Sequence, residues 1–338
     1  MKSMKHSVIK QLGMWLFALV SVLPALATGV IVPGAEWLDN EGMFINAHGG
    51  GVLYHEGVYY WYGEAKGDYT YRSPGVGWDC YRTDAGGVAC YSSRDLCNWT
   101  YEGIVLEPDT LHTFSDIHPT MVIERPKVIY NATTHQFVMW MHIDNHNYEK
   151  AVAGVAVCDT PNGKFRFIGS GRPNGQMSRD MTLFKDDDEK AYLFYSSENN
   201  ATIHIAMLSD DYRHVTSNYT RQFIGESREA PAVFKRGGKY YIITSGCTGW
   251  DPNEAEWAVA DNVMGPYTTM GNPCQGLHAD KTFYSQSTFV IPIEGTDKYI
   301  MMFDRWNKKD LITSRYVWLP IHFDGDTMTI PWLDSWAL

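Results

Sequence analysis

The chain repeats one pattern of hydrophobic and polar positions five times. In each copy a short apolar segment runs into a turn of Gly, Asp or Asn, and an aromatic-rich segment then returns. The copies occupy residues 52–62, 128–141, 183–195, 233–243 and 289–302. Short segments rich in β-branched and aromatic residues, joined by such turns, are typical of β-hairpins. The pattern therefore predicts five similar hairpins.

The spacing of the copies predicts how the hairpins are arranged. They begin about 50 to 75 residues apart, which leaves room for a four-stranded sheet and its loops in every copy. Five such sheets in a ring make a five-bladed β-propeller, and closing the ring leaves few exposed strand edges. A two-sheet sandwich would not account for five similar units, and no segment has a long helical period. We expect an all-β protein with one catalytic domain, residues 28–338.

The first 27 residues have the features of a secretory signal peptide. A lysine-containing start precedes an apolar run at 14–23, and Ala25-Leu26-Ala27 matches a cleavage site. The apolar run is too short to cross a bilayer comfortably. We therefore expect cleavage after Ala27 and a secreted, extracellular protein with no membrane segment.

Charge and composition narrow the choice of partner. The net charge of −11 becomes −14 once the three lysines of the signal peptide are removed. An acidic chain does not suit nucleic acid or anionic membranes, whereas a neutral sugar polymer is compatible with it. The 12 Trp and 21 Tyr pack well in sheets, and we expect one or two Trp rings to stack on sugars. We expect a monomer that binds a polysaccharide or an oligosaccharide.

The six cysteines, in a chain expected to be secreted, predict disulfides. The sequence does not fix their pairing, but Cys80, Cys90 and Cys97 lie close enough for one local bridge. No group of Cys and His has zinc-binding spacing, so we expect neither a metal site nor a cofactor. Four sequons are candidate glycan acceptors: Asn98, Asn131, Asn200 and Asn218.

Polar side chains recur at the entrance to every predicted inner strand. Counting back four residues from the matching apolar position gives one set: His48, Glu124, Arg179, Glu229 and Gln286. Inner strands of a propeller surround one axis, so we expect these side chains to converge on one cavity. Two carboxylates beside one pocket are what glycoside hydrolysis requires. The alternative is that Glu124 and Glu229 pair with neighbouring arginines on a solvated rim, but the shared register favours the catalytic interpretation.

The segments around these residues resemble glycoside hydrolase family 43, in particular its exo-β-1,3-galactanase branch. The resemblance rests on segments in this order: AHGGG at 47–51, WYGE at 61–64, CYSSRDLCNW at 90–99, ERPKVI at 124–129, SRD at 178–180, EAP at 229–231, YSQ at 284–286 and DRW at 304–306. It implies a five-bladed propeller and an inverting, exo-acting galactan 1,3-β-galactosidase that releases galactose from β-1,3-galactan or arabinogalactan.

The resemblance also implies roles for individual residues. Glu229 corresponds to the general acid, and Glu124 to the carboxylate that tunes the pKa of the acid and orients the sugar. The wider family has an Asp base where this chain has AHG at 47–49; the galactanase branch shares that absence and has a Gln at the position of Gln286. Our hypothesis is that Gln286 positions the attacking water, as the amide or as its imidic acid tautomer. His48 is the competing base, unless it is a satisfied histidine near the axis.

By the same resemblance, further polar residues are candidates for binding sugar hydroxyls, although each also has an ordinary structural role in a turn or strand end. They are Glu64, Tyr148, Asp180, Asn199 and Thr248. Trp250 or Trp306 is the candidate stacking platform, with core packing as the alternative. Two other functions stay open: an α-L-arabinofuranosidase or β-xylosidase on the same fold, and a sugar-binding propeller without turnover.

Overall fold

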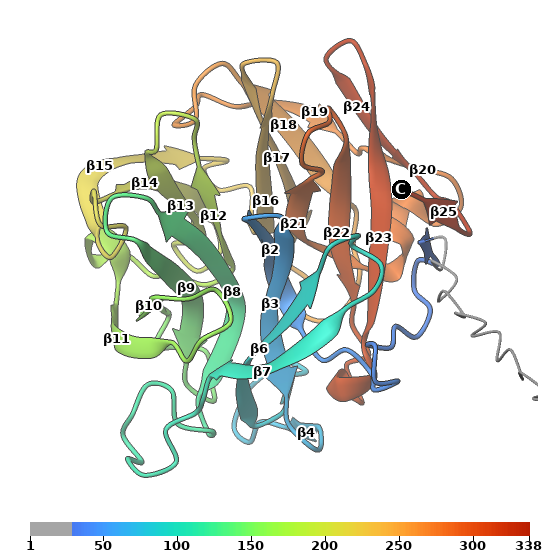
Figure 1. Ribbon diagram of the computed structural model, residues 1–338. Helices are drawn as coiled ribbons and strands as arrows, with labels where there is room; N and C mark the ends of the chain where they lie inside the picture. The colour runs from blue at the N-terminus through green and yellow to red at the C-terminus, as the bar shows by residue number, and fades with distance from the viewer. Residues whose placement is uncertain (1–28) are drawn as a thin grey trace, which may run out of the picture.

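Each predicted hairpin forms the inner two strands of a separate sheet (Figure 1). The computed structural model describes residues 29–338, and the expected signal peptide lies outside these residues. Five sheets of four or five strands surround one axis, which confirms the predicted five-bladed β-propeller. No helix in the described part of the chain is long and apolar enough to cross a membrane.

The strands of each blade are given from the axis outward. The first blade contains β2 (His48–His55), β3 (Val58–Lys66), β6 (Ala85–Ser93) and β7 (Thr100–Leu106). The second contains β8 (Val122–Asn131), β9 (Gln136–Asp144), β10 (Val152–Cys158) and β11 (Arg166–Gly171). The third contains β12 (Met181–Lys185), β13 (Ala191–Ser197), β14 (Thr202–Leu208) and β15 (Val215–Gln222).

The last two blades follow the same order. The fourth contains β16 (Arg228–Arg236), β17 (Lys239–Gly246), β18 (Glu256–Ala260) and β19 (Thr268–Gly271). The fifth contains β21 (Gln286–Pro292), β22 (Tyr299–Arg305), β23 (Arg315–Asp324), β24 (Thr327–Pro331) and β20 (Cys274–Gln275). Outside the blades lie the pair β4 (Tyr71–Arg72) and β5 (Tyr81–Arg82), and the short 3₁₀ helices η1 (Pro173–Gly175), η2 (Ala279–Tyr284) and η3 (Leu311–Thr313).

The inner strands close a ring. β2 packs against β8, β8 against β12, β12 against β16, β16 against β21, and β21 against β2. Near the two ends of the described chain, β1 (Val30–Ile31) pairs with β25 (Trp336–Ala337). Closure in this way leaves fewer unpaired strand edges than an open sheet would.

Tryptophan rings fill the seam between the first and the fifth blade. Trp61 in β3 and Trp99 before β7 are fully buried and pack against Trp318 of β23. The ring centroid of Trp61 lies 4.8 Å from that of Trp318 and 5.3 Å from that of Trp99. Tilted and edge-on contacts of this kind are favoured between aromatic rings, and burying large rings stabilises the fold. The seam thereby joins the two ends of the chain.

A β-bulge interrupts four of the five inner strands near the end where each begins. The pairing register shifts after His48 in β2, after Glu124 in β8, after Glu229 in β16 and after Ser287 in β21. A bulge breaks the regular alternation of side chains and re-aims those beside it. The same end of the propeller therefore receives polar side chains from several blades.

Two long basic side chains of β8 fill the axis beneath this end. Arg125 lines a cavity of about 690 Å³, and Lys127 lines a cavity of about 360 Å³ toward the opposite end. The Nζ of Lys127 donates to the carbonyl of Gly49 at 2.8 Å and to that of Arg125 at 3.4 Å. Burial, reinforced by the charge of Arg125, lowers the pKa of Lys127 to about 7. Arg125 and Lys127 lie between the two cavities and separate them. The larger cavity is therefore a blind pocket with a closed floor.

The expected local disulfide is not formed. All six cysteines lie among the described residues and are free thiols. Cys90 points into the core between the first and second blades, whereas Cys97 packs against the core between the first and fifth. These two sulfurs therefore lie on opposite faces of one blade. Cys80 lies apart from both, near the carbonyl of His146, so closeness in sequence does not bring the thiols together.

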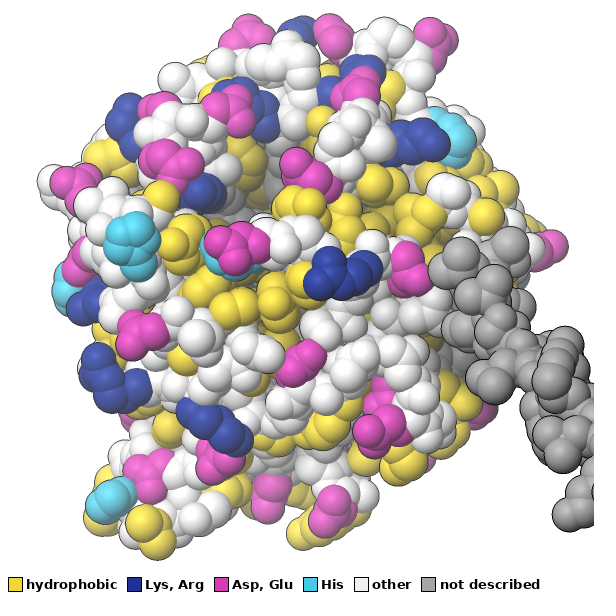
Figure 2. Space-filling view, viewed as in Figure 1, with side chains coloured by type: hydrophobic (Ala, Val, Ile, Leu, Met, Phe, Trp, Pro, Cys, Tyr) yellow, Lys and Arg dark blue, Asp and Glu magenta, His cyan; other side chains and the backbone are white. Residues whose placement is uncertain are grey.

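Acidic and basic side chains are interspersed over the face seen in Figure 2, with no single dominant patch of either sign. Such a surface differs from the continuous basic face that binds a phosphate backbone.

The tryptophan seam leads to a prediction about stability. Trp61→Ala removes a fully buried ring from the seam, and we expect it to lower the free energy of unfolding by about 3–5 kcal/mol. Phe114→Ala, at a side chain that is 98% exposed, should change it by no more than about 0.5 kcal/mol. Urea unfolding measures the free energy of unfolding of both variants. Similar losses in the two variants would show that the tryptophan seam does not stabilise the propeller.

Candidate active site

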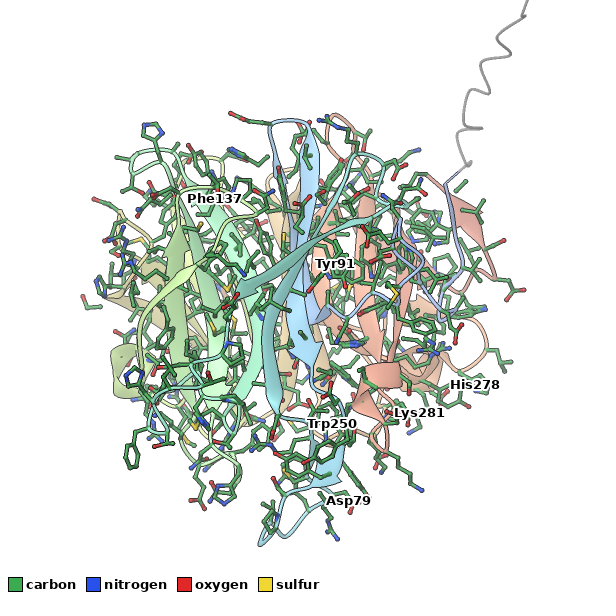
Figure 3. The ribbon with its side chains drawn as sticks, turned by 60° about the horizontal axis from the view of Figure 1, so that its bottom comes forward. Asp79, Tyr91, Phe137, Trp250, His278 and Lys281 are labelled. Carbon is green, nitrogen blue, oxygen red and sulfur yellow. The ribbon has the colours of Figure 1, made fainter. Side chains whose placement is uncertain are left out.

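The blind pocket lies at the end of the propeller where the inner strands begin. Its lining comes from all five blades and includes Glu64, Glu124, Arg125, Arg179, Asp180, Glu229 and Gln286. Trp250 and Asp79 also line it, and both lie at the lower end of the molecule in Figure 3. The predicted convergence of side chains from separate blades is therefore present.

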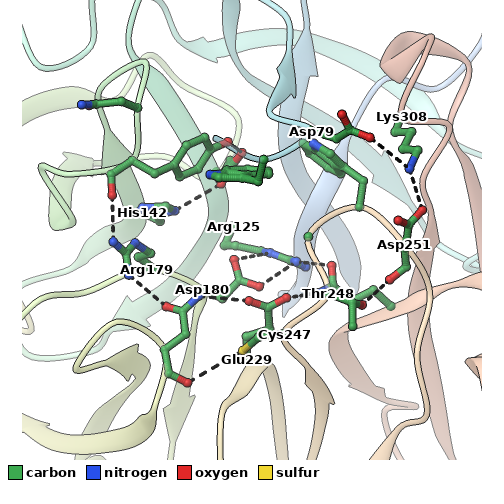
Figure 4. A pocket seen from close by; sticks show the side chains of 18 of the residues that line it. Asp79, Arg125, His142, Arg179, Asp180, Glu229, Cys247, Thr248, Asp251 and Lys308 are labelled. Atoms are coloured by element: carbon green, nitrogen blue, oxygen red, sulfur yellow. Dashed lines mark hydrogen bonds and ion pairs between the residues drawn. The ribbon is translucent and has the colours of Figure 1, made fainter. Parts of the chain in front are cut away.

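The guanidinium of Arg125 is the centre of the pocket floor (Figure 4). Arg125 follows Glu124 at the bulge of β8 and is only 5% exposed. Its Nε and Nη2 donate to the two carboxylate oxygens of Asp180 at 3.0 and 2.8 Å. Nη2 also donates to Gln286 Oε1 at 2.6 Å, and Nη1 to the carbonyl of Ser287 at 3.2 Å. One buried cation thus ties together three inner strands.

Glu124 is held as an anion. Tyr148 donates its hydroxyl to Oε1 at 2.7 Å, and His142 lies between Glu124 and Asp144, with its two ring nitrogens 3.2 and 3.0 Å from their carboxylates. Burial disfavours the imidazolium, but these two anions outweigh it and raise the pKa of His142 to about 9. Burial likewise opposes the charge of Glu124, yet His142, Lys66 and Tyr148 lower its pKa to about 2.

Glu229 has the opposite character. Burial and the nearby charge of Asp180 raise its pKa to about 8, against a smaller lowering effect of Arg125. Gln286 Nε2 donates to Oε1 at 3.0 Å, and Asn200 Nδ2 donates to Oε2 at 3.1 Å. A carboxyl group in this environment is protonated near neutral pH and can give its proton to a leaving oxygen.

Gln286 is fixed from both sides. Its Oε1 accepts hydrogen bonds from the guanidinium of Arg125 and from the indole of Trp306, the latter at 3.0 Å. Its Nε2 donates hydrogen bonds to the carboxyl group of Glu229 and to the hydroxyl of Ser245, the latter at 3.0 Å. This arrangement suits the amide tautomer, because an imidic O–H would face two N–H donors. The amide also touches the carboxyl group of Glu229, so the geometry makes it an orienting group for that carboxyl.

Most of the residues predicted from the sequence line the pocket. Besides Glu124, Glu229 and Gln286 they are Glu64, Tyr148, Asp180, Thr248 and Trp250. The hydroxyl of Thr248 donates to the carbonyl of Asp251 at 2.5 Å, so it also holds its own loop. The indole of Trp250 donates to the carbonyl of Tyr81 at 3.0 Å, which fixes one ring at the pocket wall.

His48 does not reach the pocket, and its expected role is wrong. The side chain is completely buried, stacks on Tyr316 with ring centroids 5.0 Å apart, and lies 3.6 Å from Asp304. Burial lowers the pKa of His48, which keeps the imidazole neutral. The bulge after His48 turns this side chain into the packing between the first and fifth blades. Neither ring nitrogen has a hydrogen-bond partner among the described residues, so His48 is a packed histidine and not the satisfied one expected as the alternative.

Two further predicted residues, Asn199 and Trp306, do not line the pocket. Asn199 is exposed in the turn after β13, and Asn200 takes its place in the lining. A glycan on Asn200 would fill the cavity, so we expect that sequon to stay unused. Trp306 lies behind Gln286 and is absent from the pocket lining, although its indole orients that amide.

Sequence reasoning overlooked several residues of the site. They include Lys66, Trp78, Arg125 as a charge centre, His142, Asn200 and Cys247. His142 could have been found, because it pairs directly with Glu124 across the second hairpin. Trp78 lies between β4 and β5 outside the repeating pattern, with its ring centroid 5.6 Å from that of Tyr148.

One group in the pocket has the composition of a metal site. Ligand atoms of Glu124, His142 and Asp180 all lie within 4.8 Å of one another. However, Arg125 already pairs with both oxygens of Asp180, and His142 bridges two carboxylates as a cation. Protein cations thus balance these anions, and we assign no metal here.

A carboxyl group with a raised pKa and a carboxylate with a lowered pKa, both lining one blind pocket, are the arrangement expected of a glycoside hydrolase. Comparison with known proteins identifies the family. The model of glycosyl hydrolases family 43 matches residues 50–300. The chain therefore belongs to glycosyl hydrolase family 43.

Solved structures agree with this assignment. A GH43 β-1,3-galactosidase with galactodeoxynojirimycin is 43% identical, with a TM-score of 0.84 over 91% of this chain and 100% of that one. The exo-β-1,3-galactanase of Clostridium thermocellum is 40% identical, with a TM-score of 0.81 over 91% of this chain and 66% of that one.

A glutamate-to-glutamine variant of the Phanerochaete chrysosporium exo-β-1,3-galactanase, with β-1,3-galactotriose, is 35% identical, with a TM-score of 0.81 over 92% of this chain and 68% of that one. The chain thus spans about two thirds of the length of the two galactanases. A search of curated proteins found no match.

The contacts of His142 give a prediction for the site. Glu124→Gln removes one of the two anions that stabilise the imidazolium, so we expect the pKa of His142 to fall from about 9 by about one to three pH units. Titration of the imidazole C–H signals by NMR measures the change. Glu149→Gln, at an exposed residue of the adjoining loop, is the control. An unchanged pKa in the Glu124 variant would rule out this ion pair.

Proposed function

We propose that the protein is an inverting exo-β-1,3-galactanase, which releases galactose from the ends of β-1,3-galactan or arabinogalactan chains. The observation that carries this proposal is the pairing of Glu229, protonated near neutral pH, with Glu124, an anion, in one blind pocket. Two carboxyl groups whose surroundings push their pKa values apart are suited to separate acid and charge-stabilising roles.

The shape of the pocket supports exo action. Arg125 and Lys127 close the floor, so a polysaccharide cannot thread through the propeller. A chain end can enter, and its terminal sugar then meets Glu124, Asp180 and Glu229. The leaving sugar stays toward the open rim.

The protonation of Glu229 and the negative charge of Glu124 indicate how the reaction proceeds. Glu229 gives its proton to the oxygen between the terminal sugar and the rest of the chain. The oxocarbenium-like transition state carries positive charge, which the anionic Glu124 stabilises. Gln286 and Asn200 hold the carboxyl group of Glu229 in place through its two oxygens. A water molecule attacks from the opposite face of the ring, which inverts the anomeric centre.

Specificity for galactose has support of two kinds. The pocket offers several fixed polar groups, and buried hydrogen-bonding groups reject sugars that leave them unpaired. The similar solved structures are described as β-1,3-galactosidases or exo-β-1,3-galactanases, with a galactose-like inhibitor or galactotriose bound in two of them. No observation in the structure favours an arabinofuranosidase or xylosidase.

We also propose that the protein is secreted. The support is the signal-peptide pattern of residues 1–27 and the two exposed sequons, at Asn98 and Asn218, in the chain that follows. Asn131 is buried, so its sequon gives no support. An acidic extracellular hydrolase suits a neutral cell-wall polysaccharide.

The role of Glu229 predicts the products and the effect of one substitution. The protein should release galactose from β-1,3-galactobiose, with the α-anomer formed first by ¹H NMR, and should not act on aryl α-L-arabinofuranosides. Glu229→Gln should lower kcat by about 10²- to 10⁴-fold, whereas Glu226→Gln, at an exposed neighbour, should not. Binding without release of galactose by the wild type would instead indicate a sugar-binding propeller.

The contact between Gln286 and Glu229 predicts a dependence on the leaving group. Gln286→Ala removes an amide that orients the acid, so cleavage of β-1,3-galactobiose should slow by about 10- to 100-fold, the effect of a lost buried hydrogen bond. β-Galactosyl fluoride needs little help from an acid, and its hydrolysis should slow by less than about threefold. Equal losses on both substrates would mean that Gln286 acts on the water.

A further inference from the structure

In the described part of the chain, two tryptophan rings line the blind pocket, and they differ in how much of each ring is free. Trp250 is half-buried, and its indole is tied to the carbonyl of Tyr81. The ring centroid of Trp306 lies 5.2 Å from that of Trp250, and Lys66 Nζ lies 5.6 Å from it. Trp78, by contrast, is 41% exposed. Trp78 therefore has the larger surface left for a ligand.

The ring of Trp78 lies between a loop of the second blade and a loop of the fourth. On one side its centroid is 5.6 Å from that of Tyr148, whose hydroxyl donates to Glu124. On the other side, a Cβ atom placed on Gly249 would lie 3.7 Å from two atoms of the ring. Gly249 belongs to the loop that follows β17, the strand that pairs with Glu229 in β16. The ring thus stands close to the loops that adjoin both carboxyl groups.

Exposure increases from the floor of the pocket toward Trp78. Arg125 at the floor is 5% exposed, whereas residues 247–249, which line the pocket on the side of Glu229, are exposed like Trp78. The terminal sugar occupies the floor, where the carboxyl groups act on it. The next sugar, which carries the leaving oxygen, therefore meets the exposed part of the lining.

Ion pairs between three loops hold the segment that carries Trp78 (Figure 4). Lys308 Nζ donates to Asp251 at 2.8 Å and lies 3.9 Å from Asp79. Asp79 directly follows Trp78, and its other carboxylate oxygen lies 3.4 Å from Arg72 Nη2. Each exposed pair is weak alone, but together they restrict the loop before a sugar arrives. A ring that is already in place loses less entropy when it binds a ligand.

We propose that Trp78 is the stacking platform for the second galactose of the chain, the sugar that carries the leaving oxygen; this inference rests on the proposed function. One face of a galactose ring presents C–H groups, and a flat aromatic ring covers such a face well. The second galactose lies along Trp78 while the terminal galactose lies beside Glu124 and Glu229. The ligand is thus a β-1,3-linked galactose chain of at least two residues.

This position determines which ligands depend on the ring. β-1,3-Galactobiose places a sugar on Trp78, whereas galactose and β-galactosyl fluoride occupy the floor alone. Removing the ring should therefore weaken binding of the disaccharide and leave the two monosaccharides unaffected. A general loss of structure would weaken all three.

The experiment measures binding in full-length Glu229→Gln protein, which does not consume the disaccharide. Adding Trp78→Ala should raise the Kd of β-1,3-galactobiose by about 5- to 30-fold, the effect of one lost aromatic contact. The Kd of galactose should change by less than about twofold. Isothermal titration calorimetry measures both constants.

Kinetics of the single Trp78→Ala variant give an independent measurement. Its KM for β-1,3-galactobiose should rise with little change in kcat, because the ring binds the sugar equally before and during the reaction. Its kcat/KM for β-galactosyl fluoride should stay within about twofold of the wild type.

Two further variants serve as controls. Trp78→Phe keeps a ring at the same place and should hold the Kd of galactobiose within about threefold of the parent protein. Tyr69→Ala removes a ring that is 67% exposed, lies between β3 and β4 and is outside the pocket lining. It should leave both dissociation constants unchanged.

Two results would overturn the inference. One is a galactobiose Kd that stays within about twofold after Trp78→Ala. The other is an equal rise in Kd for galactose and galactobiose, because Trp78 would then contact the terminal sugar or only support the fold. A wild-type protein that releases no galactose, together with a Glu229→Gln protein that binds neither sugar, would refute the proposed function itself.

Discussion

The buried guanidinium of Arg125 is the contact on which the site depends. Breaking a buried ion pair costs more than an exposed one, because the partner is left as an uncompensated charge. Here the cation meets Asp180 through two hydrogen bonds and meets Gln286 and the carbonyl of Ser287 with its remaining donors. The guanidinium therefore fixes which way the amide of Gln286 points, and the amide in turn holds Glu229. One side chain of the second blade thus sets the geometry of the third, fourth and fifth.

Asp180, which Arg125 holds in place, also contributes to the difference in pKa between the carboxyl groups of Glu229 and Glu124. Asp180 stays close to Glu229 and raises its pKa, while His142 keeps Glu124 ionised from the other side. A glutamate that retains its proton and a glutamate that has lost it are then present in one pocket at the same pH. That division lets one pocket both donate a proton and stabilise positive charge in a single step.

The sequence predicted the parts of the structure that repeat. Hairpin spacing gave the five blades, and counting back to the strand entrances located Glu124, Glu229 and Gln286 in one pocket. The errors arose where a local irregularity shifts the chain by one position. The bulge after His48 buries that side chain, and the turn after β13 exposes Asn199 while Asn200 enters the pocket. Contacts between blades, such as that of Arg125 with Asp180, have no local signal in the sequence.

The most direct test of this charge arrangement is the pKa of Glu229 in the free protein. Carboxyl ¹³C NMR of glutamate-labelled protein measures it, and Glu229→Gln assigns the signal. We expect a value near 8, well above the ordinary 4.5. A value at or below 4.5 would mean that Glu229 is ionised at neutral pH and cannot serve as the proton donor.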